Sequence, residues 1–293
     1  MFTQFFGNYL LNKGLVSAEN LAQALADQKN TRLKLGVLAI NAGFMTAEQV
    51  DKVHAEQQRV DKRIGDIMVD MGFVTRDQIE ELFKTQPSGH LLLGQALVDS
   101  GVMSNAQFEQ ALASYKAENG ISDADFINID DNNTNKLVAH FYKFKDDSNV
   151  KYLTGYLTLL LKNLVRFIGD DFTPMDADYV QDRVLSECIG QKISGAVDAM
   201  TVIEADSETA VKFASRFAKE EITEYDDYAQ ACLSEFLNLH NGLFAVNVSN
   251  EEGNELSLDP QAYYDTLNLS ELKNAYVVPV CFSFGTVNFV ISI

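Results

Sequence analysis

Residues 1–116 repeat one pattern of apolar, glycine and polar positions four times, with a period of 29 residues. In each copy an apolar residue precedes a first glycine, and these glycines are Gly7, Gly36, Gly65 and Gly94. Seven residues later comes a second glycine, at Gly14, Gly43, Gly72 and Gly101. Three residues beyond it comes a hydroxyl, at Ser17, Thr46, Thr75 and Ser104. A fixed period of this length is typical of repeat architectures.

Each copy carries the signals of two short helices joined by a turn. The second glycine ends the first helix, because the left-handed conformation at a helix C-terminus is cheap only for glycine. The hydroxyl caps the next helix, and an amide three residues later resembles a capping box, at Asn20, Gln49, Gln78 and Gln107. One such unit cannot bury its apolar face alone, so neighbouring units must pack together. Residues 1–116 are therefore predicted to form an all-α domain of four helix–turn–helix units.

Residues 137–293 show a mixed pattern. Apolar residues at helical spacing predict helices over 150–168, 206–218 and 228–244. Strand-like runs predict two strands and a hairpin within 183–205, a strand over 254–258, and a closing hairpin around Gly285 over 277–293. The segment 117–136 is rich in Asn, Asp and Ser and is predicted to be a linker. The second domain is thus predicted to be α/β, with an antiparallel sheet and helices.

The charge of the chain agrees with two units and argues against some partners. The 293 residues are enough for two domains, and the formal net charge is −19. Residues 1–120 contribute −3 of this charge and residues 121–293 contribute −16. So acidic a chain argues against binding of nucleic acid and against docking on an anionic membrane, because both need clustered Lys and Arg.

The cysteines and the apolar runs bear on the compartment. Cys188, Cys232 and Cys281 are widely spaced and are predicted to be free thiols in a reducing compartment. The first residues lack a signal-peptide pattern, and no apolar run reaches the ~18 residues of a membrane span. A cytoplasmic protein without membrane insertion is expected. The four histidines are far apart and lack metal-ligand spacing, so no metal site is predicted.

The predicted helix over 228–244 carries the candidate chemistry. At about 100° per residue, its apolar side chains share one face. The opposite face contains Ala231, Glu235, Asn238 and Gly242 within an arc of roughly 60°. The two small residues leave the carboxylate and the amide accessible to a partner. By themselves these positions fit either an ordinary solvated helix face or a binding site.

The repeats resemble the N-terminal domain of the type II secretion and pilus-extension ATPases. The resemblance lies in the glycines and in the closing glutamines Gln28, Gln57 and Gln86, with Tyr115 at that position in the fourth copy. The basic residue that begins this family's motif is present as Lys34 and Arg63, whereas the other copies have Phe5 and Leu92. Some members bind cyclic di-GMP through this domain. The resemblance implies cyclic di-GMP as an effector that contacts Lys34 and Arg63; the alternative is a domain that serves only for packing or docking.

The second half resembles the CheC/CheX chemotaxis phosphatases. Glu235-Phe-Leu-Asn238, followed by Gly242, is similar to the family's Glu-x-x-Asn motif, and Pro260 lies near the family's downstream proline. The family often has Asp or Ser four residues before the Glu, where this chain has Ala231. A second Glu-x-x-Asn is absent from the helix over 150–168, so the chain resembles the one-site members.

This second resemblance implies hydrolysis of the phospho-aspartate of a response-regulator receiver domain. Asn238 would orient the attacking water, and Glu235 would bind a cation of the partner, the receiver's active-site Lys. The receiver would bring the phosphoryl group and Mg²⁺, so the chain would need no cofactor of its own. The alternative is a non-catalytic adaptor that binds a receiver domain and responds to cyclic di-GMP through residues 1–116.

A homodimer is expected from the closing hairpin. This hairpin is rich in Val, Phe and Ile and has no Lys or Arg after Val277, so it would present an edge that must pair or be protected. Members of the CheC/CheX family also commonly form dimers.

Overall fold

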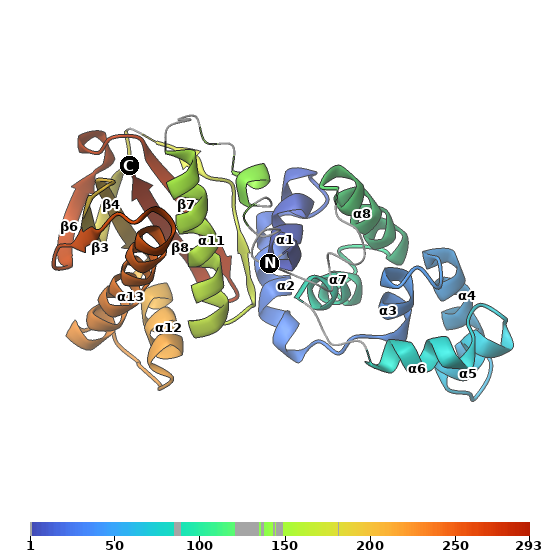
Figure 1. Ribbon diagram of the computed structural model, residues 1–293. Coiled ribbons are helices and arrows are strands. Elements are labelled where there is room, and N and C mark those ends of the chain that lie inside the picture. The colour runs from blue at the N-terminus through green and yellow to red at the C-terminus, as the bar shows by residue number, and fades with distance from the viewer. Residues whose placement is uncertain are drawn as a thin grey trace. The chain divides into compact units, whose positions relative to one another are not determined.

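The computed structural model describes residues 2–84, 89–120, 135, 138–142, 144, 149–180 and 182–293. The chain divides into two compact units, residues 3–128 and residues 129–293 (Figure 1). Most of the predicted linker, 117–136, lies outside the described residues, and the domain limits 1–116 and 137–293 stay predictions. In the described part of the chain, no helix has the length and apolar character needed to cross a membrane.

The described part of the first unit is helical. Its α-helices are α1 (Phe2–Asn12), α2 (Ala18–Asp27), α3 (Leu35–Asn41), α4 (Ala47–Gln57), α5 (Ile64–Asp70), α6 (Arg76–Lys84), α7 (Gly89–Asp99) and α8 (Asn105–Glu118), with a 3₁₀ turn at Gln28–Asn30. The left-handed conformation predicted for the second glycines is present, with φ between 66° and 74° at Gly14, Gly43, Gly72 and Gly101. The predicted capping boxes are present at Thr46, Thr75 and Ser104, and Ser17 accepts a hydrogen bond from the backbone N–H of Asn20.

Two of the first glycines, Gly36 and Gly94, mark places where two helices approach closely. A Cβ added to Gly36 would lie 2.7 Å from a methyl of Val50, and one added to Gly94 would lie 2.2 Å from the ring of Phe108. Both partners come 14 residues later in the sequence, on the next helix of the chain. These contacts explain the glycine in these two copies, since a side chain there would push the two helices apart.

The helices of the repeats do not all begin alike. Lys34 and Arg63 have extended backbones, and α3 and α5 begin at the next residue. The corresponding residues Phe5 and Leu92 lie inside α1 and α7, which begin before the first glycine. Phe5 is completely buried and Leu92 is half-buried, so an apolar side chain at this position packs within the helices and the helix continues through it. The first helix therefore starts one residue before the first glycine in the second and third copies, and several residues before it in the first and fourth.

The described part of the second unit contains an eight-stranded sheet and three long helices. The helices are α11 (Val150–Phe167), α12 (Ser207–Ala218) and α13 (Asp227–Glu252). The strands are β1 (Phe172–Pro174), β2 (Asp178–Tyr179), β3 (Val184–Gly195), β4 (Ala199–Glu204), β5 (Leu256–Leu258), β6 (Ala262–Asn268), β7 (Ala275–Phe282) and β8 (Gly285–Ser292), with a 3₁₀ turn at Leu269–Glu271. The strand order is β1-β7-β8-β4-β3-β5, with β2 also beside β7 and β6 also beside β3, and each of these pairs is antiparallel. An antiparallel sheet with helices was the predicted class.

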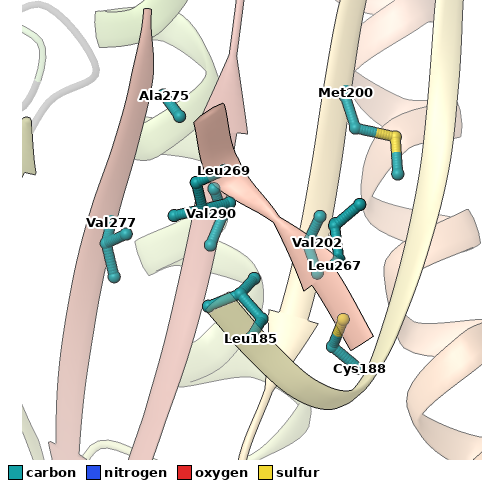
Figure 2. Close-up of a cluster of buried hydrophobic side chains, with 9 residues drawn as sticks. All are labelled: Leu185, Cys188, Met200, Val202, Leu267, Leu269, Ala275, Val277 and Val290. Carbon is teal, nitrogen blue, oxygen red and sulfur yellow. The ribbon is translucent and has the colours of Figure 1, made fainter. Parts of the chain in front are cut away.

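The sheet is apolar on both faces. On one face the rings of Phe213 in α12 and Phe236 in α13 meet the ring of Phe289 in β8, with ring centres 5.0 to 6.4 Å apart. The other face carries a cluster that Figure 2 shows, made of Leu185, Cys188, Met200, Val202, Leu267, Leu269, Ala275, Val277 and Val290. The three cysteines are free, and burial raises the pKa of the Cys188 thiol to about 12. The apolar side chains of the sheet thus pack against the apolar face of α13.

The position of the closing hairpin corrects one expectation. β7 pairs with β1 and β2 on one side and with β8 on the other, and β8 pairs with β4. The hairpin therefore lies inside the sheet and presents no open edge, and its apolar side chains are core residues. The argument for a homodimer from this hairpin is wrong.

Candidate functional site

One face of α13, called the ridge below, carries Ala231, Glu235, Asn238 and Gly242, as the helical spacing predicts. Asp226 caps the helix, because its carboxylate accepts hydrogen bonds from the backbone N–H groups of Tyr228 and Ala229 at 3.1 and 2.9 Å. The apolar face is buried from Cys232 to Phe244, except for the half-buried Leu239 and Leu243. The helix continues eight residues beyond the predicted end and stops where Gly253 takes a left-handed conformation, with φ of 69°.

The outer face presents a carboxylate and an amide one turn apart. Glu235 is exposed and has no hydrogen-bond or ion-pair partner among the described residues. Asn238 is half-buried, and Ala231 is exposed. Nothing lies within 4 Å of the place where a Cβ on Gly242 would be. The two small residues therefore leave space on both sides of the pair for an approaching partner.

The amide of Asn238 is held from below by a second amide. Its Oδ1 accepts a hydrogen bond of 3.0 Å from Nε2 of Gln191, which lies in β3 and is only 2% exposed. The same Nε2 donates to the backbone carbonyl of Asp259 at 2.8 Å. Asn238 Nδ2 makes no hydrogen bond to the described residues, so it is free to bind a water molecule or a partner atom.

The hydrogen bonds continue from Gln191 into the core. Asn241 donates through Nδ2 to Gln191 Oε1 and to Thr201 Oγ1, both at 2.8 Å. Thr201 in turn donates to the backbone carbonyl of Gln191 at 3.1 Å. Tyr156 on α11 donates to Asn241 Oδ1 at 3.2 Å. Burial raises the pKa of Tyr156, which keeps its hydroxyl protonated and therefore a donor. The candidate amide is thus the outer end of a chain of polar groups that crosses the unit.

His240 is the histidine nearest to this ridge in sequence, and its position does not suit proton transfer. The ring is completely buried, packs edge-on against Tyr156 with ring centres 4.3 Å apart, and lies 3.0 Å through Nδ1 from Nδ2 of Asn163. Burial lowers its pKa to about 3, so the imidazole is neutral near pH 7. Among the described residues, no group of three or more His, Cys, Asp or Glu is placed to hold a metal ion.

The residues predicted to contact cyclic di-GMP line two adjoining hollows of the first unit. One hollow is lined by Lys34, His54 and Gln57, and the other by Arg63, Arg76 and Phe83, while Leu35 and Ile64 contribute to both. The ammonium of Lys34 is paired with Asp99 at 2.6 Å. Gln86, the other closing glutamine of this pair of repeats, lies outside the described residues.

Sequence reasoning missed Gln191 and the Asp259 carbonyl. A signal for the first was present, because Gln191 is an amide between Ile189 and Ile193 at an inward position of a predicted strand. A polar group at such a position needs a partner. A backbone carbonyl leaves no such signal in a sequence.

Comparisons with known proteins find a partial structural likeness. No family model and no curated protein matches the chain. A CheC-like superfamily protein from Shewanella sp. PV-4 is 15% identical, with 49% of this chain and 97% of that chain covered and a TM-score of 0.44. The CheX–CheY–BeF3–Mg²⁺ complex from Borrelia burgdorferi matches at 19% identity, 48% and 96% coverage and a TM-score of 0.40. CheX from Vibrio vulnificus matches at 14% identity, 48% and 98% coverage and a TM-score of 0.43. The resemblance of residues 1–116 to secretion ATPases stays a prediction.

Proposed function

We propose that the second unit hydrolyses the phospho-aspartate of a response-regulator receiver domain, as a CheX-like phosphatase. Asn238 orients the attacking water and Glu235 binds a cation of the receiver. The observation that carries the proposal is the pairing of a free carboxylate with a held amide on one open ridge of α13. A receiver partner also places the protein in the cytoplasm.

The chemistry requires little from this chain. Water attacks phosphorus in line with the bond to the aspartate oxygen; its new P–O bond forms as that bond breaks, and the products are inorganic phosphate and a free aspartate. The receiver supplies Mg²⁺, and phosphoryl transfer depends mainly on positioning and electrostatics. Asn238 Nδ2 donates to the oxygen of the water, and a second lone pair on Oδ1 can accept one of its protons. The neutral, buried His240 has no part in this step.

The decay rate of a phosphorylated receiver tests the proposal. The protein should accelerate the decay, and Asn238→Ala should remove on the order of 10²-fold of the acceleration, because the water loses its orientation. Asn247→Ala is a matched control, since Asn247 is an exposed amide farther along α13. Equal activity of Asn238→Ala and the wild type would exclude the catalytic role of Asn238.

Glu235 should act through binding. Its carboxylate is exposed, so a cation of the receiver can reach it. Glu235→Ala should raise the receiver concentration that gives half-maximal acceleration at least as much as it lowers the maximal rate. A lower maximal rate with unchanged half-saturation would contradict the role assigned to Glu235.

The adaptor is the second candidate, and Ala231 favours it. This alanine stands on the ridge where the resembled family often has Asp or Ser. An adaptor would bind the receiver without changing its decay rate. Binding measured by titration, together with an unchanged decay rate for the wild-type protein, would establish the adaptor and reject the phosphatase.

For the first unit we propose cyclic di-GMP as an effector. Lys34 and Arg63 line adjoining hollows, and the arginine fork suits a phosphate or a guanine. The ammonium of Lys34 is already paired with Asp99, and this ion pair must break or weaken before Lys34 can bind a phosphate, so the affinity for cyclic di-GMP should be modest. Isothermal titration of the full chain should show binding that Arg63→Ala abolishes and Arg59→Ala retains. An absence of heat at high micromolar ligand would leave the repeats as a packing or docking domain.

The homodimer also stays a proposal, with a different edge. No described strand pairs with the outer edge of β6, the longest of the strands that have a partner on one side only, so β6 rather than the closing hairpin offers an open edge. A second copy could pair there. Light scattering should give twice the chain mass of 32.6 kDa. A single chain mass at working concentration would reject the dimer.

A further inference from the structure

The direction of each hydrogen bond beneath α13 follows from one backbone group. The carbonyl of Asp259 can only accept, and the Gln191 atom 2.8 Å from it must therefore be the donor Nε2. One proton of this Nε2 goes to Asp259, which leaves the other for Asn238 at 3.0 Å. The Asn238 atom facing it must accept, so it is Oδ1. Asn238 Nδ2 then points away from Gln191.

The other end of Gln191 obeys the same constraint. Its Oε1 accepts from Asn241 Nδ2 at 2.8 Å, so the Asn241 oxygen faces the hydroxyl of Tyr156, which donates at 3.2 Å. In this network every donor faces an acceptor. Reversal of any one amide would place two donors or two acceptors in contact. In a site this deeply buried, such a mismatch is costly. The network therefore has one stable polarity.

We propose that Gln191 is a positioning residue that selects one of the two orientations of the Asn238 amide. Without it, the amide can turn by half a rotation and exchange its donor for its acceptor. With it, Nδ2 faces the open side of the ridge and Oδ1 stays below. This inference rests on the proposed function, because it concerns the amide that orients the water. Gln191 is only 2% exposed and acts through Asn238 alone, with no contact to the partner.

Two buried substitutions separate positioning from stability. Gln191→Met keeps the size of the side chain and removes the donor to Asn238. Tyr156→Phe removes a hydrogen bond from the same network but leaves the contact between Gln191 and Asn238 intact. Both variants should lose thermal stability. Only Gln191→Met should lower the maximal rate of receiver dephosphorylation, by about tenfold, with unchanged half-saturation. If Gln191→Met does not fold, Gln191→Leu replaces it, since its smaller side chain is also uncharged and also removes the donor.

Nuclear magnetic resonance relaxation of the Asn238 side-chain amide in the full chain gives a readout that does not need activity. The order parameter of Nδ2 should be high in the wild type and in Tyr156→Phe, and lower in Gln191→Met. An equally ordered amide in Gln191→Met would overturn the inference, as would a rise in half-saturation with an unchanged maximal rate. If the wild type accelerates no receiver, the proposed function fails by itself, and the order parameter alone decides whether Gln191 positions Asn238.

Discussion

The first glycines of the repeat allow a sharp test of how the first unit packs. Gly94 and Gly65 occupy the same position in consecutive repeats and both lie in helices. A Cβ on Gly94 would lie 2.2, 2.7 and 3.0 Å from three ring carbons of Phe108. A Cβ on Gly65 would meet only a methyl of Leu35 at 3.4 Å and methyls of Ile79 at 3.6 and 3.8 Å, which are ordinary contacts. Replacement by alanine should therefore destabilise the first unit at Gly94 but not at Gly65.

The magnitudes follow from two opposing effects. Replacing glycine by alanine inside a helix gains about 0.5–1 kcal/mol of stability. Forcing an extra methyl into a packed core costs about 1–3 kcal/mol. Phe108 is completely buried and lies edge-on to the ring of Phe6 with ring centres 6.2 Å apart, so it has no free space to move into. Gly94→Ala should destabilise α7 and α8 by about 1–2 kcal/mol, whereas Gly65→Ala should be neutral or stabilising.

Hydrogen-exchange mass spectrometry of the full chain measures this effect helix by helix. Protected amides of α7 and α8 should exchange roughly 5- to 30-fold faster in Gly94→Ala, because each 1.4 kcal/mol is about a factor of ten. Gly65→Ala should leave exchange in α5 and α6 unchanged or slower. The amides of α13 serve as an internal control. Unchanged protection in Gly94→Ala, or faster exchange in both variants, would show that the distance from Phe108 does not decide the effect of the substitution.

Two further predictions concern the second unit. Arg216 donates two hydrogen bonds of 2.6 and 2.9 Å to the carboxylate of Asp171. Arg216→Ala should lower the free energy of unfolding by about 3–5 kcal/mol in a urea titration, because it leaves this buried carboxylate without its cation. Arg166→Ala, at an exposed position, should cost far less in the same titration. The pKa of His240 falls from 6.5 to about 3 on folding, so the unfolded chain binds more protons than the folded chain between these pH values. The free energy of unfolding should therefore fall as the pH drops below 6.5, by on the order of 2 kcal/mol at pH 5. A urea midpoint that did not decrease between pH 7 and pH 5 would contradict this.

Much of the second unit could be predicted because its long elements carry strong periodic signals. The helices over 150–168 and 206–218 and the hairpin over 183–205 lie within a few residues of the observed elements. Three strands, β1, β2 and β6, were missed. β1 and β2 have three and two residues, too few for a pattern, and β6 follows Pro260 with mostly exposed side chains, so its alternation carries little apolar contrast.

The candidate site could be predicted only in part. The angular spacing of α13 was sufficient to bring Glu235 and Asn238 onto one ridge, because helix geometry fixes which positions share a face. The partner of Asn238, Gln191 in β3, is 47 residues away in sequence, and the carbonyl that holds Gln191 belongs to Asp259 in the segment after β5. Pairing across such distances depends on strand order, which periodicity does not encode. The edge position assumed for the closing hairpin failed for the same reason.

The contact of Gln191 with the Asp259 carbonyl gives Pro260 a remote influence on α13. A residue before proline is confined to extended conformations, so the direction of this carbonyl is constrained by covalent geometry. Asp259 N–H also donates to the carbonyl of Lys192 at 3.1 Å, next to Gln191, which fastens the loop to β3. The orientation of the Asn238 amide on α13 is therefore constrained partly by Pro260, through the direction of the Asp259 carbonyl. Chains that share the helix motif but differ at this loop would be expected to differ in chemistry while appearing identical along the helix.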